Sequence, residues 1–180
     1  MARVLIPLAD GCEELEAVTV IDLLRRAGIE VTVAGLKPGT VRASRGVQLV
    51  PDTTLDAALQ HDYDMVVLPG GLPGATHLRE DPRIIALLQK MAAAGRYTAA
   101  ICAAPRVLAE AGVLQGKQAT GYPGTLDGLA DVSVSSAPVV RDGKVLTSRG
   151  PGTAMDFALA LIEALVGGEK RREVEAGLVR

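Results

Sequence analysis

The stretch Tyr97–Val113, YTAAICAAPRVLAEAGV, changes its hydrophobic period in the middle, and the residue at the change is a cysteine. Up to Ile101 it is a short apolar run typical of a buried strand, and beyond the cysteine apolar residues recur at helical spacing. Cys102 therefore lies at a predicted strand-to-helix corner. The residues two before and two after it, Ala100 and Ala104, are small, as a sharp turn that exposes a nucleophile requires.

Two interpretations of this corner remain open from the pattern alone. A cysteine that precedes a helix faces free backbone N–H groups and the positive end of the helix dipole, which stabilise a thiolate. On this interpretation Cys102 is a reactive nucleophile whose pKa lies below about 8.5. On the other, it is a buried structural cysteine, because cysteine behaves as a small apolar residue in many protein cores.

The segments around the corner repeat one pattern: a strand, a helix that ends at glycine, and a second strand. The first unit is predicted over 3–9, 13–28 and 29–36, and the second over 64–71, 82–95 and 96–101. Such βαβ units favour a parallel sheet. We therefore predict one domain over residues 1–180 with a doubly wound α/β fold, a flavodoxin-like three-layer sandwich with a mostly parallel sheet and helices on both faces.

The rest of the chain predicts shorter elements. Turn residues and short apolar pieces over 39–55 indicate an antiparallel excursion at an edge. An RDGK turn inside 138–148 predicts a β-hairpin, with two short strands before it. A strong helix is predicted over 152–168, capped near Thr153 and closed by two glycines.

Composition narrows the function classes. Hydrophobic residues make up 48% of the chain and aromatic residues only 2%, so the core must be built from Val, Leu, Ile and Ala, which suits parallel strands covered by helices. A formal charge of −2 gives no reason to expect a nucleic acid or an anionic membrane as partner. Neither the N-terminal apolar run nor the later one, which Glu163 interrupts, predicts a signal peptide or a membrane span.

The chain has two cysteines, Cys12 and Cys102, at a spacing that is not typical of a disulfide scaffold. It has no CxxC pair and no Cys/His cluster, so no metal site is expected. A reducing, cytoplasmic location is the expectation that follows.

Three loops should meet beyond the carboxyl ends of the strands, where open α/β sheets bind ligands. They are ADGCEELE, PGGLPGA and ICAAP. PGGLPGA lacks the spacing of a nucleotide-binding loop. We therefore predict that Gly70 and Gly71 present backbone N–H groups to the thiol. The alternative is an ordinary tight turn. Glu16 falls near the apolar helix face defined by Leu15 and Val18, where it would stay protonated and donate a hydrogen bond.

Motifs along the whole chain resemble the ThiJ/PfpI superfamily, in its DJ-one and YajL branch. They are GCEELEAV, VLPGG followed by GA, AAICAAP, and LTSRGPGTAMDFALALIEAL. The resemblance implies that Cys102 is an oxidisable nucleophile and that Glu16 hydrogen-bonds it, with backbone donors from Gly71 and Ala103. It further implies a homodimer that needs no cofactor.

The resemblance also implies a pocket around the thiol. Gly70 and Tyr122 would belong to it, and Arg45 and Arg26 match basic residues that border the family pocket near the dimer contact. The family is credited with protection against oxidative and carbonyl stress, including glyoxalase or deglycase activity on methylglyoxal-type substrates and chaperone action. Peptidase-like relatives place a histidine directly after the nucleophile, where this chain has Ala103, so we set a protease aside.

Two functions therefore remain open. In an enzyme, Cys102 would add to the carbon of a small aldehyde or glycated substrate, and Glu16 would move the proton. In a redox sensor or redox-regulated chaperone, Cys102 would be oxidised to sulfinic acid, which the protonated Glu16 would stabilise. Cys12 is either a half-buried turn residue or a resolving thiol. The only histidines, His61 and His77, are expected on the surface.

Overall fold

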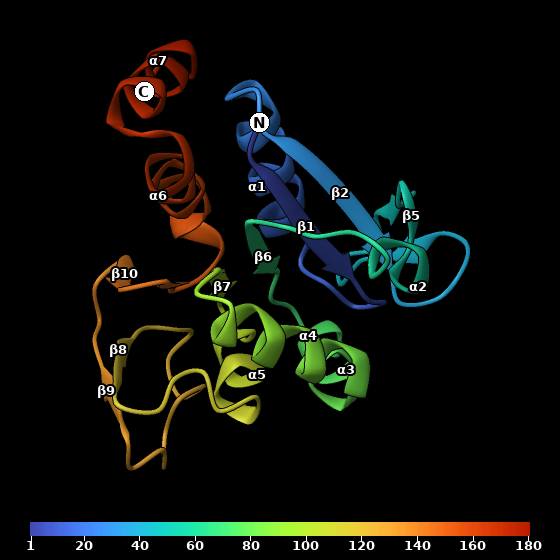
Figure 1. Ribbon diagram of the computed structural model, residues 1–180, viewed down its shortest axis with the longest axis vertical. Coiled ribbons are helices and arrows are strands. Elements are labelled where there is room, and N and C mark those ends of the chain that lie inside the picture. Colours follow the sequence, from blue (N-terminus) through green and yellow to red (C-terminus); the bar gives the residue numbers. More distant parts are fainter.

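The central sheet of the computed structural model, which describes residues 1–180, has seven strands in the order β10-β11-β7-β6-β1-β2-β5 (Figure 1). Neighbouring strands are parallel except for the edge pair β10 and β11. In sheet order, the strands are β10 (Val139–Asp142), β11 (Val145–Ser148), β7 (Tyr97–Ile101), β6 (Met65–Leu68), β1 (Arg3–Leu8), β2 (Glu30–Gly35) and β5 (Thr53–Thr54). The predicted mostly parallel sheet is confirmed.

Helices cover both faces of this sheet. Their bounds are α1 (Glu14–Arg26), α2 (Leu55–Ala58), α3 (Gly74–Glu80), α4 (Pro82–Ala93), α5 (Pro105–Glu110), α6 (Ala154–Val166) and α7 (Gly168–Gly177). Helices α1 and α6 pack together over a core of 27 buried residues, and α4 and α5 contribute to a second core of 23. Two cores of similar size on one sheet are what the predicted three-layer sandwich requires.

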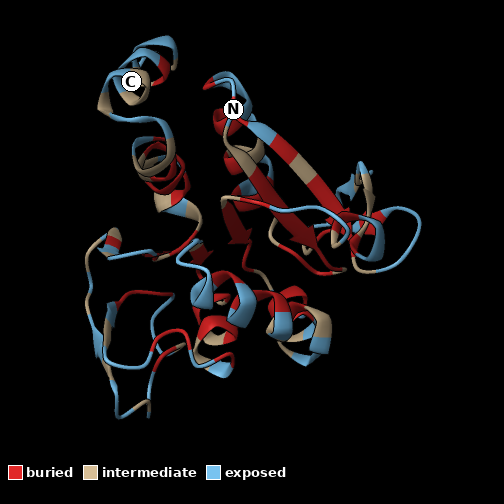
Figure 2. Ribbon diagram, viewed as in Figure 1, coloured by how far each residue is buried: buried red, intermediate tan, exposed pale blue.

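Strand β1 shows why the sequence gives two cores. Side chains of a strand alternate between its faces, and Val4 and Ile6 enter the first core while Leu5 enters the second. All three are fully buried, and Figure 2 shows the central strands as buried along almost their whole length. Nearly continuous apolar strands are typical of a parallel sheet covered on both sides.

The smaller elements lie at the margins. The segment 39–55 forms the predicted antiparallel pair, β3 (Val41–Arg42) with β4 (Gln48–Leu49), before β5 joins the edge of the main sheet. The RDGK turn joins the predicted hairpin of β10 and β11. Two further short strands, β8 (Lys117–Ala119) and β9 (Val132–Val134), pair in parallel. No helix combines the length and the apolar character that crossing a bilayer demands.

The start of α6 differs from the prediction. A short 3₁₀ turn, Pro151–Thr153, precedes the helix, and the Thr153 side chain does not cap it. The Thr153 hydroxyl instead lies 2.7 Å from Ser148 Oγ and accepts a hydrogen bond from Gly150 N at 3.1 Å. The predicted cap is wrong because this hydroxyl stabilises the preceding loop, which follows β11 at the carboxyl edge of the sheet.

Candidate functional site

Cys102 sits at the corner between β7 and α5 in a left-handed backbone conformation, with φ of 64°. This conformation is unfavourable for residues other than glycine by about 1 kcal/mol or more, so the surroundings must hold it. Cys102 N donates to Ser148 O at 3.0 Å, and Tyr122 N donates to Cys102 O at 2.8 Å. The backbone is thus fixed on both sides of the predicted nucleophile elbow, and the residue is only 8% exposed.

Gly70 and Gly71 bring the loop after β6 directly against this corner. A Cβ added at Gly70 would lie 2.7 Å from both Cys102 Cβ and Glu16 Oε2, closer than side chains tolerate. Gly71 has a φ of 89°, and a Cβ there would lie 2.6 Å from Gly11 O. The approach of backbone to thiol therefore requires glycine at both positions.

Glu16 reaches the thiol from the first turn of α1 and is fully buried. Its Oε2 accepts a hydrogen bond from Gly70 N at 2.8 Å, whereas Oε1 has no partner. The helix buries Glu16 together with Ala17 and Val20. Leu15 and Val18, which the sequence pattern placed on the buried face, are about half exposed. The predicted buried stripe is therefore wrong, although the burial of Glu16 is as predicted.

The buried position of Glu16 changes its ionisation. Burial raises the pKa of its carboxyl to about 7, although hydrogen bonding to the Cys102 thiol and to Gly70 N opposes the rise. The carboxyl and the thiol therefore influence each other's ionisation, through hydrogen bonding and through the charge of Glu16. A carboxyl with a pKa near neutrality can both accept and donate a proton.

The thiol of Cys102 does not follow the sequence prediction. Burial raises its pKa to about 12, and the negative charge of Glu16 adds to the rise. The N–H groups of Ala103 and Gly71 lower it by hydrogen bonding, but they do not prevail. The pKa is raised rather than lowered, contrary to the prediction, because burial and the charge of Glu16 outweigh these N–H groups.

The structure places four of the residues that the sequence assigned to the site around the sulfur of Cys102. They are Glu16, Gly70, Gly71 and Ala103. Tyr122 contributes its backbone N–H to Cys102 O, but its side chain is 56% exposed.

The two arginines assigned to the pocket lie differently. Arg45 is exposed, and its backbone N donates to Glu14 rather than its guanidinium approaching the thiol. Arg26 is in the last turn of α1 and pairs with Asp22, whereas Glu16 is in the first turn. Ten residues of helix separate Arg26 from Glu16, about 15 Å along the axis. Within one chain Arg26 lies apart from Glu16, and its place beside the pocket at a dimer contact stays a prediction.

Cys12 is 1% exposed and is a free thiol, like Cys102. Burial raises the pKa of its thiol to about 12, and the charges of Glu14 and Glu13 add to the effect. It lies close to the glycine loop, because a Cβ added at Gly71 would lie 2.7 Å from Cys12 C. The residue is thus fully buried rather than half-buried, and its role as a resolving thiol stays a prediction.

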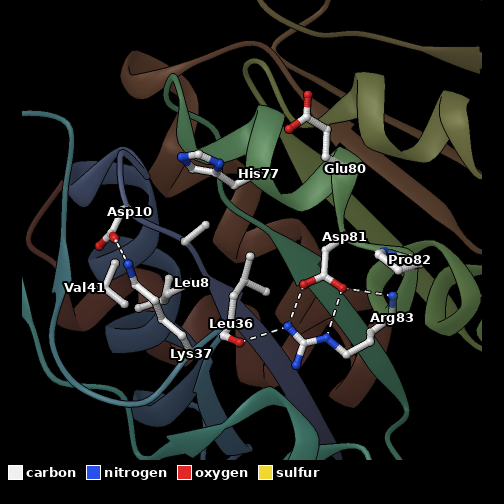
Figure 3. A pocket seen from close by; sticks show the side chains of 11 residues that line it. Leu8, Asp10, Leu36, Lys37, Val41, His77, Glu80, Asp81, Pro82 and Arg83 are labelled. Carbon is white, nitrogen blue, oxygen red and sulfur yellow. Dashed lines mark hydrogen bonds and ion pairs between the residues drawn. The ribbon is translucent and has the colours of Figure 1, made fainter.

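One cavity of the structure lies apart from Cys102 and the residues around it. It has a volume of about 540 Å³ beside the ends of β1 and β2, where Asp10 pairs with Lys37 and Arg83 pairs with Asp81 (Figure 3). His77 borders this cavity, and both histidines are exposed as predicted. No cysteine or serine lines the cavity, and most of its charged side chains already form ion pairs.

A second cavity, of about 410 Å³, lies beside Ala103. Two basic residues that the sequence interpretation missed, Arg79 and Arg106, line it. Their positions in the sequence could have indicated this. Arg79 lies in the last turn of the helix after the glycine loop, and Arg106 follows Cys102 by four residues.

Known proteins share this architecture over nearly the whole chain. The family model described as the DJ-1/PfpI family matches residues 2–164. Protein dj-1beta of Drosophila melanogaster is 48% identical over 178 residues, which cover 97% of this chain and 95% of that protein. Its crystal structure matches with a TM-score of 0.95 at 47% identity, covering 99% of this chain and 97% of the other.

Two further relatives bear on the chemistry. Oxidized DJ-1 of Toxoplasma gondii matches with a TM-score of 0.95 at 42% identity, covering 99% of this chain and 98% of the other. The glutathione-independent glyoxalase DJR-1.2 of Caenorhabditis elegans is 36% identical over 171 residues, which cover 94% of this chain and 90% of that protein.

The raised pKa of Glu16 predicts a pH-dependent stability. The carboxyl ionises near 4.5 in the unfolded chain and near 7 in the native protein, so between these values the native state binds more protons and stability falls as pH rises. Glu16→Gln removes this effect while its side-chain oxygen can still accept from Gly70 N. Between pH 4 and 8, wild type should lose about 3 kcal/mol of unfolding free energy relative to Glu16→Gln.

Urea unfolding across this pH range measures the difference. Glu110→Gln, which removes an exposed carboxylate on α5, is the matched control and should follow wild type at every pH. A constant difference between wild type and Glu16→Gln would show that Glu16 has an ordinary pKa.

Proposed function

The chain belongs to the DJ-1/PfpI family, and we propose that it protects against carbonyl stress as a cofactor-free glyoxalase or deglycase that acts on methylglyoxal-type aldehydes and their adducts. The observation that carries this proposal is a fully buried carboxyl, Glu16, whose pKa is about 7, coupled to the thiol of Cys102. A glyoxalase needs a nucleophile and a group that exchanges protons at neutral pH, and this pair supplies both. The name of the DJR-1.2 relative supports the same reaction class.

The reaction begins with formation of a bond between Cys102 Sγ and the aldehyde carbon. The proton of the thiol passes to the Glu16 carboxylate, and the electron pair of the carbonyl π bond moves to oxygen. This transfer compensates for the raised pKa of the thiol, because the sulfur loses its proton only as it attacks. Glu16 then gives this proton to the substrate oxygen, so the product is a neutral hemithioacetal and the carboxylate is free again.

The oxygen that gains charge in this step needs donors that are already in place. Gly71 and Ala103 present backbone N–H groups to the sulfur, and the same groups would hold an oxygen bound to the carbon that the sulfur attacks. Glycine is needed at positions 70 and 71 for this function, because a side chain at either position would displace the loop and the N–H donor that it presents.

Glu16 then moves a proton between the two substrate carbons. It removes the hydrogen of the former aldehyde carbon as a proton and returns a proton to the neighbouring carbon. The hydroxyl proton on the former aldehyde oxygen passes to the former ketone oxygen, which leaves a thioester on Cys102. Water cleaves the thioester and releases lactate and the free thiol. Methylglyoxal and one water thus become lactate without an external oxidant, because the aldehyde carbon is oxidised as the ketone carbon is reduced.

The proposal includes a homodimer in the cytoplasm. The exposed apolar side chains of Leu15 and Val18 on α1 and Met155 on α6 lie on helices that pack together, and a second copy of the chain would cover them. In such a dimer Arg26, which is on the same helix as Leu15 and Val18, would lie near the interface.

A redox sensor or redox-regulated chaperone is the second candidate, and one observation favours it. Glu16 Oε1 is fully buried and has no hydrogen-bond partner. In its protonated form this carboxyl could donate to an oxygen of a sulfinic acid on Cys102, which would satisfy the unpaired group. Two peroxide molecules would oxidise the thiol to this acid with release of two waters. The oxidized Toxoplasma gondii relative supports this chemistry.

Purified protein should convert methylglyoxal to lactate. Cys102→Ser should abolish the activity, and Glu16→Gln should lower it by at least about 100-fold, because the remaining amide cannot exchange the proton. An enzymatic assay for lactate measures the rates, with Glu110→Gln as a control that should retain wild-type activity. Absence of lactate with wild type, or an unchanged rate with Glu16→Gln, would overturn the proposed mechanism.

Graded peroxide should convert Cys102 to sulfinic acid before it oxidises Cys12, because Cys12 is 1% exposed and Cys102 is 8% exposed beside Glu16. Mass spectrometry of peptides follows each cysteine separately.

If Cys12 is a resolving thiol, a Cys12–Cys102 disulfide should form under mild peroxide and Cys12→Ser should accumulate sulfinic acid faster. Equal oxidation of the two cysteines would refute a specialised redox site at Cys102.

A further inference from the structure

A cavity adjoins the candidate site at Ala103, which lines it. It has a volume of about 410 Å³, within the range of small-molecule sites, roughly 300–1,000 Å³. Ala103 is one of the two backbone donors to the sulfur, and Leu72, which follows the other donor, Gly71, lines the same cavity. A ligand whose reactive carbon contacts Cys102 can therefore extend into this cavity.

The charged groups of this cavity come from three elements. Arg79 lies in the last turn of α3, Arg106 lies in the first turn of α5, and Asp127 belongs to the loop after α5. Neither arginine forms a salt bridge, and the only hydrogen bond of Arg106 through its guanidinium goes to the carbonyl of Asp127 at 3.5 Å. Both arginines are partly buried, whereas Asp127 is exposed. Two positive side chains and one negative side chain thus line the cavity, which leaves its net formal charge positive.

Other arginines of the fold are bound by carboxylates. Arg83 binds Asp81 and Asp56, and Arg25 binds Asp52. Guanidinium groups provide several donors in a planar arrangement that suits carboxylate and phosphate oxygens. Two unpaired guanidinium groups in one cavity therefore provide a binding site for a small anionic group.

We propose that Arg79 and Arg106 bind the anionic group, carboxylate or phosphate, of an aldehyde substrate whose carbonyl carbon faces Cys102. This proposal rests on the proposed function, because it assigns the substrate class to the same thiol. Anionic 2-oxoaldehydes, such as 4,5-dioxopentanoate with its carboxylate or 3-phosphooxy-2-oxopropanal with its phosphate, are then better substrates than neutral methylglyoxal. Asp127 repels an anion, but its exposed position leaves it more strongly screened by solvent.

Alkylation of Cys102 tests the anion site without requiring turnover. Iodoacetate and iodoacetamide both react when the sulfur bonds to their methylene carbon and iodide leaves, but only iodoacetate carries a carboxylate. The ratio of the two rates at the Cys102 peptide, measured by mass spectrometry, should fall by about five- to ten-fold in Arg79→Gln/Arg106→Gln, the effect of two partly exposed charge interactions. High salt should reduce the ratio in wild type and not in the double variant.

Arg172→Gln, an exposed arginine on α7 at the far end of the molecule, is the matched control and should retain the wild-type ratio (Figure 1). Circular dichroism confirms that the double variant is folded. An unchanged ratio in the folded double variant would overturn the proposal, whether or not the protein produces lactate.

Turnover then distinguishes the anionic groups. The double variant should lose kcat/KM for 4,5-dioxopentanoate if the site takes a carboxylate, and for 3-phosphooxy-2-oxopropanal if it takes a phosphate, while kcat/KM for methylglyoxal should change by less than about two-fold. An equal loss for methylglyoxal would contradict an anion site. If no aldehyde is turned over by wild type, the proposed function fails, and the alkylation ratio alone decides whether the two arginines bind anions.

Discussion

The contact between the Gly70 backbone and the carboxyl of Glu16 holds the candidate site together. Gly70 N donates to Glu16 Oε2 at 2.8 Å, and Glu13 N, at the start of the same helix, donates to Gly70 O at 2.9 Å. These bonds join the loop after β6 to the helix after β1 directly above the sulfur of Cys102. Because an added Cβ at Gly70 would collide with both reacting side chains, the loop approaches closely enough only as glycine.

This arrangement explains the electrostatics of the site. Glu16 is fully buried, and only one of its two carboxyl oxygens accepts a hydrogen bond from the backbone. Its ionised form is therefore destabilised, and its pKa rises to about 7. The same burial raises the pKa of the Cys102 thiol, and the charge of Glu16 raises it further. A proton on the carboxyl therefore favours ionisation of the sulfur, and the two groups titrate as a coupled pair. Both candidate functions depend on this coupling.

The sequence predicted the fold and much of the site because both depend on local patterns. Glycine ends, apolar runs and the alanines around Cys102 are visible without a structure, and the loops they connect must meet at one edge of a parallel sheet. The face of α1 that is buried was not predictable from its apolar residues. Leu15 and Val18 remain exposed in the single chain, whereas a charged residue, Glu16, is buried, so periodicity alone misidentified the face.

The remaining failures have tertiary causes. The pKa of Cys102 depends on how deeply the corner is buried and on the charge of Glu16, and neither follows from the position of a cysteine before a helix. For Arg26, which lies about 15 Å along the helix from Glu16, the predicted place near a dimer contact stays a prediction. Arg79 and Arg106 gain importance only because α3 and α5 pack together, which brings two residues distant in sequence to one cavity.

Titration of the Glu16 carboxyl by carbon NMR, with selectively labelled glutamate and Glu16→Gln for assignment, tests the coupled pair most directly. In wild type the carboxyl resonance should titrate with a midpoint near 7. In Cys102→Ser the midpoint should shift, because the hydrogen bond from the thiol, which lowers the pKa, is replaced by that of a different donor. A midpoint near the ordinary glutamate value of about 4.3, unaffected by Cys102→Ser, would contradict the coupling of acid and thiol.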